Sequence, residues 1–265
     1  MYSAKYVKAR DIDDAVKALK SANDAKFLPG GMTLIPTLKQ RLANPDCLVD
    51  LSACGLSLID DEGSAILIGA MTRHVDVETS EIVVRSIPAL VVLAAKIGDR
   101  QVRNRGTIGG SIANNDPSAC YPSAALALDA TIHTNSRDIA ADDFFVGMFE
   151  TALEEDEIIT AISFPKPAAA AYAKFPNPAS RYAMVGVFVA KGDSVRVTVT
   201  GAGEDGVFRH AGLEAALTSS FAQESVEPVT VSGEEMISDM HAASDYRAHL
   251  VKEMTRRAVA ACGWP

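Results

Sequence analysis

Two glycine pairs hold the residues of this sequence whose types and spacing could bind an anion. In Thr107-Ile108-Gly109-Gly110-Ser111, two residues without a Cβ stand between two hydroxyl side chains. Such a backbone can turn sharply with its N–H groups facing a ligand, and the hydroxyls can bind an anion or cap the next element. The surrounding run, residues 101–114, is too polar for a buried strand and too glycine-rich for a helix. We therefore expect a loop suited to a diphosphate, with a tight interdomain turn as the alternative.

The second glycine pair lies near the N-terminus, in Pro29-Gly30-Gly31-Met32-Thr33-Leu34. It directly follows the apolar run 25–28 and precedes a segment with helical character. The pair is therefore expected at the C-terminal end of a strand and beside the start of a helix, which is a favourable place for phosphate.

The two loops together resemble those of the FAD-binding medium subunits of the molybdenum hydroxylases, the xanthine dehydrogenase family. The likeness covers nearly the whole chain and is greatest to the medium subunits of aerobic carbon monoxide dehydrogenases. Its most specific part is QVRNRGTIGG, residues 101–110, with the later pair Asp116-Pro117. The resemblance implies an α+β fold. It would consist of a two-lobed PCMH-type FAD-binding domain, as in the vanillyl-alcohol oxidase and MurB flavoproteins, and a small α+β C-terminal domain.

The resemblance also implies a domain division and a cofactor. Residues 1–166 would form the FAD-binding domain, with lobes at about 1–53 and 54–166, and residues 167–265 the C-terminal domain of the carbon monoxide dehydrogenase flavoprotein type. The chain would hold FAD and no metal, and no side chain would act as a catalytic residue. The residues that the resemblance assigns to the cofactor are Pro29, Gly30, Gly31, Met32, Thr33, Leu34, Thr107, Ile108, Gly109, Gly110, Ser111, Asn114, Asp116, Cys120 and Tyr182.

By the same resemblance, the chain carries electrons between partners. A large molybdopterin subunit would oxidise the substrate, and a small subunit with [2Fe–2S] clusters would pass the electrons to this FAD. The reduced flavin would then pass them to an external acceptor. We expect the three subunits to assemble as a dimer of heterotrimers in the cytoplasm, with the inner face of the membrane as an option.

Five positions differ from the family pattern or keep a second interpretation. Cys120 stands where the family often carries an aspartate near the ribityl chain, and Met32 stands where carbon monoxide dehydrogenase has a histidine. Tyr182 lies in a segment that resembles the family segment beside the flavin ring, with packing at the domain interface as the alternative. Arg103 and Arg105 could neutralise phosphate or contact a partner subunit.

Composition excludes several classes of protein. A net charge of −9 argues against a nucleic-acid partner, because a phosphate backbone requires a basic face. The longest apolar run, around 90–95, is too short to span a bilayer, and no secretory signal is visible at the N-terminus. The four cysteines are scattered without a C-x-x-C pair, and the five histidines form no metal-binding spacing. We therefore expect any metal chemistry to belong to another polypeptide, and a reducing compartment.

The elements that must position these loops can be read from apolar periodicity. Strands are expected at 4–8, 25–28 and 47–51, with a helix capped by Asp11 and another opened by Thr33, so that a small parallel sheet forms. Next we expect a hairpin at 58–70 and a helix capped by Thr72. A second helix should begin at Pro88 and end at Gly98, and a third should cover 118–128. Strands are then expected at 131–133 and 157–162. Residues 164–171 predict a linker. A hairpin at 183–200 and helices at 210–217 and 244–261 then complete the C-terminal domain.

Gly201-Ala202-Gly203-Glu204-Asp205-Gly206 matches the dinucleotide fingerprint G-x-G-x-x-G, but we reject it. A Rossmann loop enters a helix at once, whereas the residues after Gly206 predict extended chain. The two carboxylates would also lie beside a pyrophosphate.

Other functions stay open at the level of sequence. The substrate of the complex could be xanthine, nicotinate, an aldehyde or another heterocycle. A self-contained flavin oxidase would require a larger substrate domain than the C-terminal region offers. A non-catalytic module whose glycine loops are only turns is the third alternative.

Overall fold

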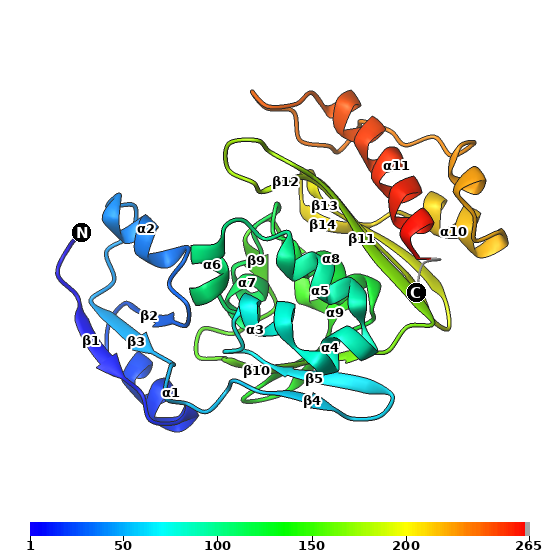
Figure 1. The fold of residues 1–265 in the computed structure, drawn as a ribbon. Coiled ribbons are helices and arrows are strands. Elements are labelled where there is room, and N and C mark those ends of the chain that lie inside the picture. Colours follow the sequence, from blue (N-terminus) through cyan, green and yellow to red (C-terminus); the bar gives the residue numbers. More distant parts are fainter. Residues whose placement is uncertain (263–265) are drawn as a thin grey trace.

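The computed structural model describes residues 1–262, which form three lobes along the chain (Figure 1). The N-terminal lobe is a three-stranded parallel sheet, in the order β1-β3-β2, flanked by two helices. Asp11 caps the first helix, since its side chain accepts a hydrogen bond from Asp14 N at 2.8 Å. The elements are β1 (Lys5–Lys8), α1 (Ile12–Lys20), β2 (Ala25–Leu28), α2 (Leu34–Lys39) and β3 (Cys47–Asp50).

The middle lobe is built on a five-stranded antiparallel sheet in the order β4-β5-β10-β6-β7. Short helices cover this sheet, and their apolar residues form the largest core of the molecule. The elements are β4 (Ile59–Asp61), β5 (Ala65–Gly69), α3 (His74–Thr79), α4 (Glu81–Ser86), α5 (Pro88–Ala95), α6 (Arg100–Arg105), α7 (Ile108–Asn114), α8 (Tyr121–Ala127), β6 (Thr131–Thr134), β7 (Asp138–Ala140), α9 (Ala141–Phe144), β8 (Phe145–Gly147), β9 (Glu150–Thr151) and β10 (Ile159–Pro165).

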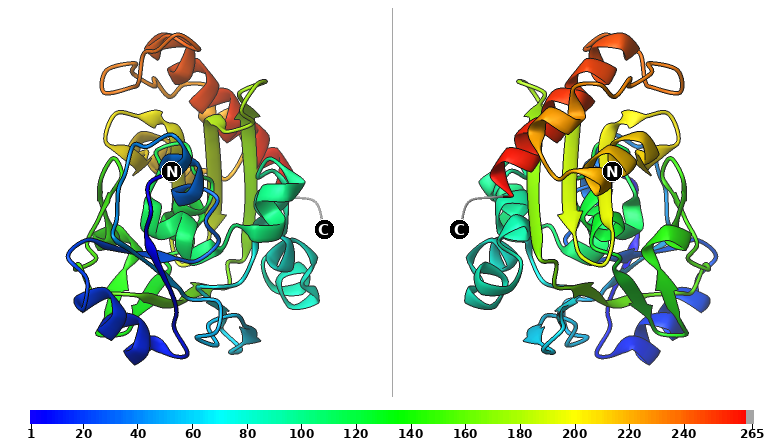
Figure 2. Two further views of the ribbon diagram at one scale, coloured as in Figure 1. Left: turned by 90° about the vertical axis from the view of Figure 1, so that its left-hand side faces the viewer. Right: turned by 90° about the vertical axis from the view of Figure 1, so that its right-hand side faces the viewer.

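The C-terminal lobe is a four-stranded antiparallel meander, β11-β12-β13-β14, between two layers of helices. Helix α8, which is buried along its whole length, packs on β12 and β13, while α10 and α11 complete a separate core with the same sheet (Figure 2). The strand β12 is buried on both faces for this reason. The elements are β11 (Ala169–Pro176), β12 (Ala183–Lys191), β13 (Val195–Gly203), β14 (Gly206–Arg209), α10 (Ala211–Ser219), the 3₁₀ turn η1 (Gln223–Val226) and α11 (Ser244–Ala261).

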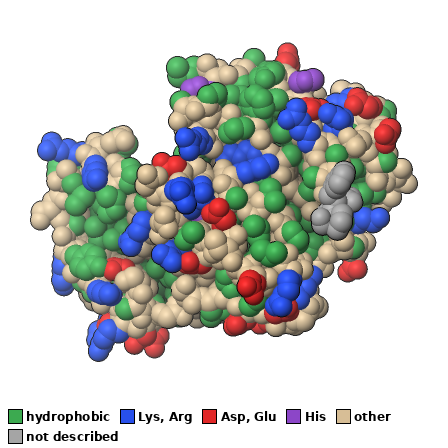
Figure 3. Space-filling model, in the orientation of Figure 1, with side chains coloured by type: hydrophobic (Ala, Val, Ile, Leu, Met, Phe, Trp, Pro, Cys, Tyr) green, Lys and Arg blue, Asp and Glu red, His purple; other side chains and the backbone are tan. Residues whose placement is uncertain are grey.

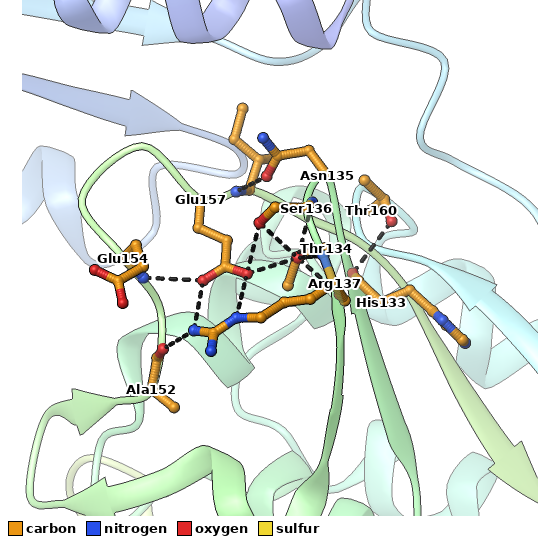
Figure 4. A network of polar contacts seen from close by, with 10 residues as sticks. His133, Thr134, Asn135, Ser136, Arg137, Ala152, Glu154, Glu157 and Thr160 are labelled. Atoms are coloured by element: carbon orange, nitrogen blue, oxygen red, sulfur yellow. Dashed lines mark hydrogen bonds and ion pairs between the residues drawn. The ribbon is translucent and has the colours of Figure 1, made fainter.

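A polar network fixes the connection between the middle and N-terminal lobes (Figure 4). The buried carboxylate of Glu157 accepts bonds from Arg137 at 3.0 Å, Thr134 at 2.7 Å and Ser136 at 2.9 Å. The next residue, Ile158, belongs to the core of the N-terminal lobe. By fixing Glu157, the network therefore holds Ile158, a residue of the middle lobe, in the core of the N-terminal lobe.

Most of the elements predicted from periodicity are confirmed, and three predictions are wrong in part. Residues 100–105 and 108–114 are helical, not a loop. Thr72 caps no helix, because its hydroxyl donates to Leu58 O at 2.9 Å and α3 begins after Arg73. The expected linker is mostly sheet, since β10 extends to Pro165 and β11 starts at Ala169. The division of domains at residue 166 stays a prediction.

The rejected glycine motif is strand and turn, as predicted. Gly201 and Gly203 end β13, and Gly206 begins the strand β14 and not a helix. Within residues 1–262, no helix is both long and apolar enough to cross a bilayer.

Candidate functional site

The two glycine loops lie against each other. A Cβ on Gly30 would collide with the carbonyl oxygen of Arg105 and lie 2.9 Å from the Cα of Gly106. On the other side of the contact, a Cβ on Gly110 would lie 3.2 Å from the Pro29 ring. The first loop ends a strand of the N-terminal lobe and the second belongs to the helices of the middle lobe. The glycines therefore allow backbones of two lobes to meet where larger residues would separate them.

The first loop offers a cluster of unused backbone donors. Among the described residues, no acceptor binds the N–H groups of the five residues Gly30, Gly31, Met32, Thr33 and Leu34. Gly31 has a φ of +72°, which turns the chain sharply before α2 begins. The Thr33 side chain makes no capping bond and is exposed, whereas Met32 and Leu34 are half-buried. Consecutive free N–H groups in a turn form a concave site for an anion.

The second loop is helical because tertiary contacts use its polar groups. The Thr107 hydroxyl caps α7 by accepting from Gly110 N at 3.2 Å. Ile108 N donates to Thr72 O at 3.0 Å, and Gly109 N donates to Ala70 O at 2.9 Å.

The expectation that this loop presents its N–H groups to a ligand is therefore wrong for residues 108–110. Gly109 is needed for packing, since a Cβ there would lie 2.5 Å from the Ala70 Cβ. In the described residues, the Ser111 hydroxyl has no partner and stays available.

The segment after α7 turns sharply at a residue that sequence reasoning missed. Asn115 is buried in the left-handed conformation at φ 40°. Its amide donates to Gly147 O at 2.8 Å and Glu150 O at 2.9 Å, which ties the β8–β9 hairpin to α7. Asn114, which the resemblance assigns to the cofactor, is half-buried and has no side-chain partner among the described residues. The Asn115 side chain therefore binds the backbone of the hairpin, and the Asn114 side chain is available for a ligand.

Asp116, Cys120 and Tyr182 come together from two lobes. Burial raises the pKa of the Tyr182 hydroxyl, and the neighbouring acidic groups of Asp116 and Cys120 raise it further. Burial also raises the pKa of Asp116, whose carboxylate accepts from Ser118 N at 2.8 Å. Tyr182 is 48% exposed, so it is not enclosed in an interdomain core. The tyrosine lies at the surface of a cluster that reaches inward to the buried Cys120.

Basic side chains near the loops have distinct roles. Arg103 donates to Glu78 at 2.7 Å and to Ile97 O at 2.8 Å, which makes it a structural residue. Within residues 1–262, Arg105 has no carboxylate partner. Lys174 lies 3.4 Å from Cys120 Sγ, a contact that the sequence did not predict because β11 was expected to be linker in part.

His74, which the sequence indicated only as a surface or core residue, is buried beneath the second loop. Its ring lies 5.3 Å from that of Tyr121, and a Cβ on Gly106 would be 2.6 Å from its Nε2. Burial, together with the charge of Arg103, lowers the pKa of His74 to about 4. The ring is therefore neutral near pH 7 and acts as packing for the loop.

No group of three or more His, Cys, Asp or Glu side chains that could hold a metal ion exists in residues 1–262. The arrangement consists instead of unused N–H donors, a free hydroxyl and amide, and an exposed aromatic ring. These groups suit a ligand with a diphosphate, a polyhydroxyl chain and a flat ring.

Comparisons with known proteins agree on one family. Residues 2–167 match the family model described as FAD binding domain in molybdopterin dehydrogenase. The nicotine 6-hydroxylase medium subunit of Paenarthrobacter nicotinovorans is 33% identical, over 98% of this chain and 97% of its own. The carbon monoxide dehydrogenase medium chain of Hydrogenophaga pseudoflava is also 33% identical, over 96% of this chain and 95% of its own. The solved structure of carbon monoxide dehydrogenase from Hydrogenophaga pseudoflava, which lacks the Mo-pyranopterin moiety of its cofactor, matches with a TM-score of 0.89 and 33% identity. It covers 98% of this chain and 97% of the matched one.

Proposed function

The chain belongs to the family of FAD-binding domains in molybdopterin dehydrogenases. From this membership we propose which of its residues bind FAD, which subunits are its partners and which substrate the complex oxidises. It is the FAD-binding medium subunit of a molybdenum hydroxylase, an oxidoreductase that works as a complex of several subunits. When bound, FAD supplies reversible two-electron chemistry that no side chain of this chain supplies.

The contact between Gly30 and Arg105 carries the proposal for the cofactor. The contact brings the first loop, with its free N–H groups in residues 30–34, against the loop that carries Ser111. These donors bind the diphosphate, while Pro29 and the residues Thr107 to Gly110 shape the cradle. Asn114, Asp116 and Cys120 bind the polar chain next to it, and Tyr182 lies against the flat ring.

Cys120 replaces the carboxylate that the resemblance leads one to expect. A thiol is a weak hydrogen-bond acceptor, so it binds a hydroxyl less strongly than a carboxylate does. Lys174, at 3.4 Å from Sγ, supplies a charged donor at the same place. The pair keeps this part of the cradle polar although the negative charge is missing.

We further propose that the partners are a small [2Fe–2S] subunit and a large molybdopterin subunit, in a cytoplasmic dimer of heterotrimers. The chain's own residues bind and orient the cofactor, and substrate oxidation belongs to the partner with the molybdenum. The test is to purify the tagged chain from its native host. Co-purification of two further subunits, with flavin absorbance, iron and molybdenum, is expected, and a chain that oxidises substrate alone would contradict the assignment.

The substrate that we propose is carbon monoxide, with a nitrogen heterocycle as the second candidate. The second candidate is kept because the nicotine and carbon monoxide relatives are equally similar to this chain, at 33% identity. Assaying the purified complex with carbon monoxide and with pyridine and purine compounds distinguishes the two. If the complex reduces a dye with carbon monoxide and not with the pyridine or purine compounds, the first candidate is supported.

A further inference from the structure

A buried arginine of the last helix connects two strand ends of the C-terminal lobe. Arg247, near the start of α11, is 4% exposed and packs against the four-stranded sheet. Its Nη1 donates to Met184 O at 2.7 Å and to Gly201 O at 2.6 Å. Because both acceptors are backbone carbonyls, one on β12 and one on β13, Arg247 ties the ends of these two strands to the helix that covers them.

The two strands stop pairing with each other at this point. Their register ends with Gly186 opposite Thr200, so Met184 and Gly201 lie beyond it. Gly201 has a φ of +83°, and a Cβ there would lie 2.4 Å from Ala183 O and 2.8 Å from Met184 O. Buried backbone carbonyls require a donor, and beyond the paired register the guanidinium of the arginine supplies it.

Each of the two strand ends adjoins a segment that we assign to the cofactor. Tyr182 immediately precedes β12. On the other strand, Gly201 N donates to Pro117 O at 2.7 Å, and Thr200 Oγ1 donates to the same oxygen at 2.8 Å. Pro117 directly follows Asp116 in the chain. By joining the two strand ends, the arginine therefore fixes where the Tyr182 segment lies relative to the Asp116 segment.

The turn that carries Tyr182 lies where two lobes are separated. Figure 3 shows an indented surface between the N-terminal and C-terminal lobes, and in Figure 1 the turn between β11 and β12 borders this indentation. At the base of the turn, Asn177 N donates to Tyr182 O at 2.8 Å, while the tyrosine side chain is half exposed. A shift of the strand end would therefore move the ring with little resistance from packing.

A carboxylate that is itself held by backbone balances the charge of Arg247. Its Nη2 donates to Asp239 Oδ2 at 2.8 Å, and Asp239 Oδ1 accepts from His241 N at 2.8 Å and from Ala242 N at 3.0 Å. A buried ion pair contributes little net stability compared with apolar side chains of similar size. A planar guanidinium, however, donates in fixed directions. Control of geometry therefore explains this arginine better than a gain in stability does.

We propose that Arg247 is a positioning residue for the flavin reaction, and that it acts through Tyr182 without touching the cofactor. By holding the strand ends, Arg247 keeps the Tyr182 ring at the place from which it contacts the flavin and sets the approach of the electron acceptor. The proposal rests on the function proposed above, because only that function places Tyr182 against the flat ring of FAD.

The test compares Arg247→Lys and Arg247→Met in the assembled, FAD-loaded complex. Lysine keeps the charge but loses the planar fork of donors, and methionine removes all of these bonds. Both variants should retain FAD, and flavin fluorescence should rise, because a tyrosine in contact with a flavin quenches its emission. Reoxidation of the reduced complex by ferricyanide should slow about tenfold in Arg247→Met and less in Arg247→Lys, since a misplaced ring obstructs the acceptor.

Met254→Ala is the matched control. Met254 is buried on the same helix and in the same core, and its apolar side chain forms no hydrogen bond that could hold the strand ends. The cavity should lower the free energy of unfolding while fluorescence and reoxidation stay as in the wild type. If Arg247→Met does not fold, Arg247→Lys, which keeps a charge opposite Asp239, gives the answer. Arg247 variants with lower stability but wild-type fluorescence and reoxidation would overturn the proposal.

A double-mutant cycle tests the route through Tyr182. In the Tyr182→Ala background, Arg247→Lys should have no further effect on fluorescence or reoxidation, whereas fully additive effects would contradict the inference. The single variants separate the two proposals. A wild-type complex without FAD, or unchanged fluorescence and reoxidation in Tyr182→Ala, would contradict the proposed function and with it this inference. Altered values in Tyr182→Ala beside unchanged values in both Arg247 variants would contradict this inference alone.

Discussion

Gly30 packs its Cα against the carbonyl of Arg105, with no room for a side chain between them. The two residues belong to different lobes, and each borders one of the glycine pairs that sequence analysis singled out. This contact sets how closely the first loop, with its free N–H groups, approaches the loop that leads into helix α7.

Gly30→Ala tests the contact directly. The added Cβ would collide with Arg105 O, and backbone on both sides must move, so we expect FAD content to fall at least tenfold and stability to decrease by about 1–3 kcal/mol. Gly192→Ala is the matched control, since a Cβ there meets nothing within 4 Å. Flavin absorbance per chain and chemical unfolding give both quantities. Wild-type FAD content in Gly30→Ala would show that the loops need not touch.

Gly110→Val is expected to lose flavin while the fold persists. Its Cβ would lie 2.9 Å from Thr107 Oγ1 and 3.2 Å from Pro29, so the branched side chain disturbs the cap of α7 and presses on the first loop. Gly212→Val, also in a helix, makes only ordinary contacts at 3.4 Å or more and serves as the control. Flavin titration of the two purified variants measures the difference. If Gly110→Val binds stoichiometric FAD at wild-type affinity, the second loop has only a structural role.

Tyr182→Ala is expected to retain much of the FAD but to change flavin fluorescence and electron-acceptor kinetics. The ring is half exposed and lies beside Asp116 and Cys120, and the proposed diphosphate donors are the N–H groups of residues 30–34. Tyr182→Phe keeps the ring and should restore the fluorescence if contact with the ring is the cause. An unchanged spectrum and unchanged kinetics in Tyr182→Ala would leave the residue a packing role only.

Because its pKa is lowered in the folded protein, protonation of His74 should decrease the free energy of unfolding in mild acid. Its pKa is about 4 in the folded protein and about 6.5 in an unfolded chain, so the unfolded state binds a proton first as the pH falls. The contribution is fully present above about pH 6.5 and decreases toward pH 4, by up to about 3 kcal/mol. Denaturant unfolding between these pH values should therefore show a slope that His74→Phe reduces. The same slope in both proteins would assign the loss to other groups.

Protonation of Glu157 should decrease the free energy of unfolding a second time, in stronger acid. Its hydrogen bonds, chiefly from Arg137, lower the pKa of the carboxyl from 4.5 to about 2. The stabilisation is present above about pH 4.5 and is lost as the pH falls toward 2, because the unfolded chain is protonated first.

Glu157→Gln should therefore decrease the free energy of unfolding at pH 7 by about 1–3 kcal/mol and flatten the acid limb. Glu155→Gln, an exposed neighbour, should change neither. Identical acid limbs in the wild type and Glu157→Gln would place the stabilising charge elsewhere.

The elements of the N-terminal lobe could be predicted from sequence because each depends on residues a few positions apart. Asp11 caps α1 through the third residue after it, and alternating strands and helices imply the parallel order of β1, β3 and β2. The glycine pair at the end of β2 is found in the same way. The resemblance carried by residues 101–110 and Asp116-Pro117 added the family, which the comparisons confirm.

Only the tertiary structure decided that residues 108–114 are helical and where their N–H groups bond. A glycine-rich run has weak helix propensity, but the carbonyls of Ala70 and Thr72, far away in the sequence, accept its first N–H groups. Likewise, Arg247, Met184 and Gly201 come from a helix and two strands, and no local pattern predicts that they meet. Caps and periodicity act within a few residues, whereas these contacts depend on how whole elements pack, which local sequence patterns do not contain.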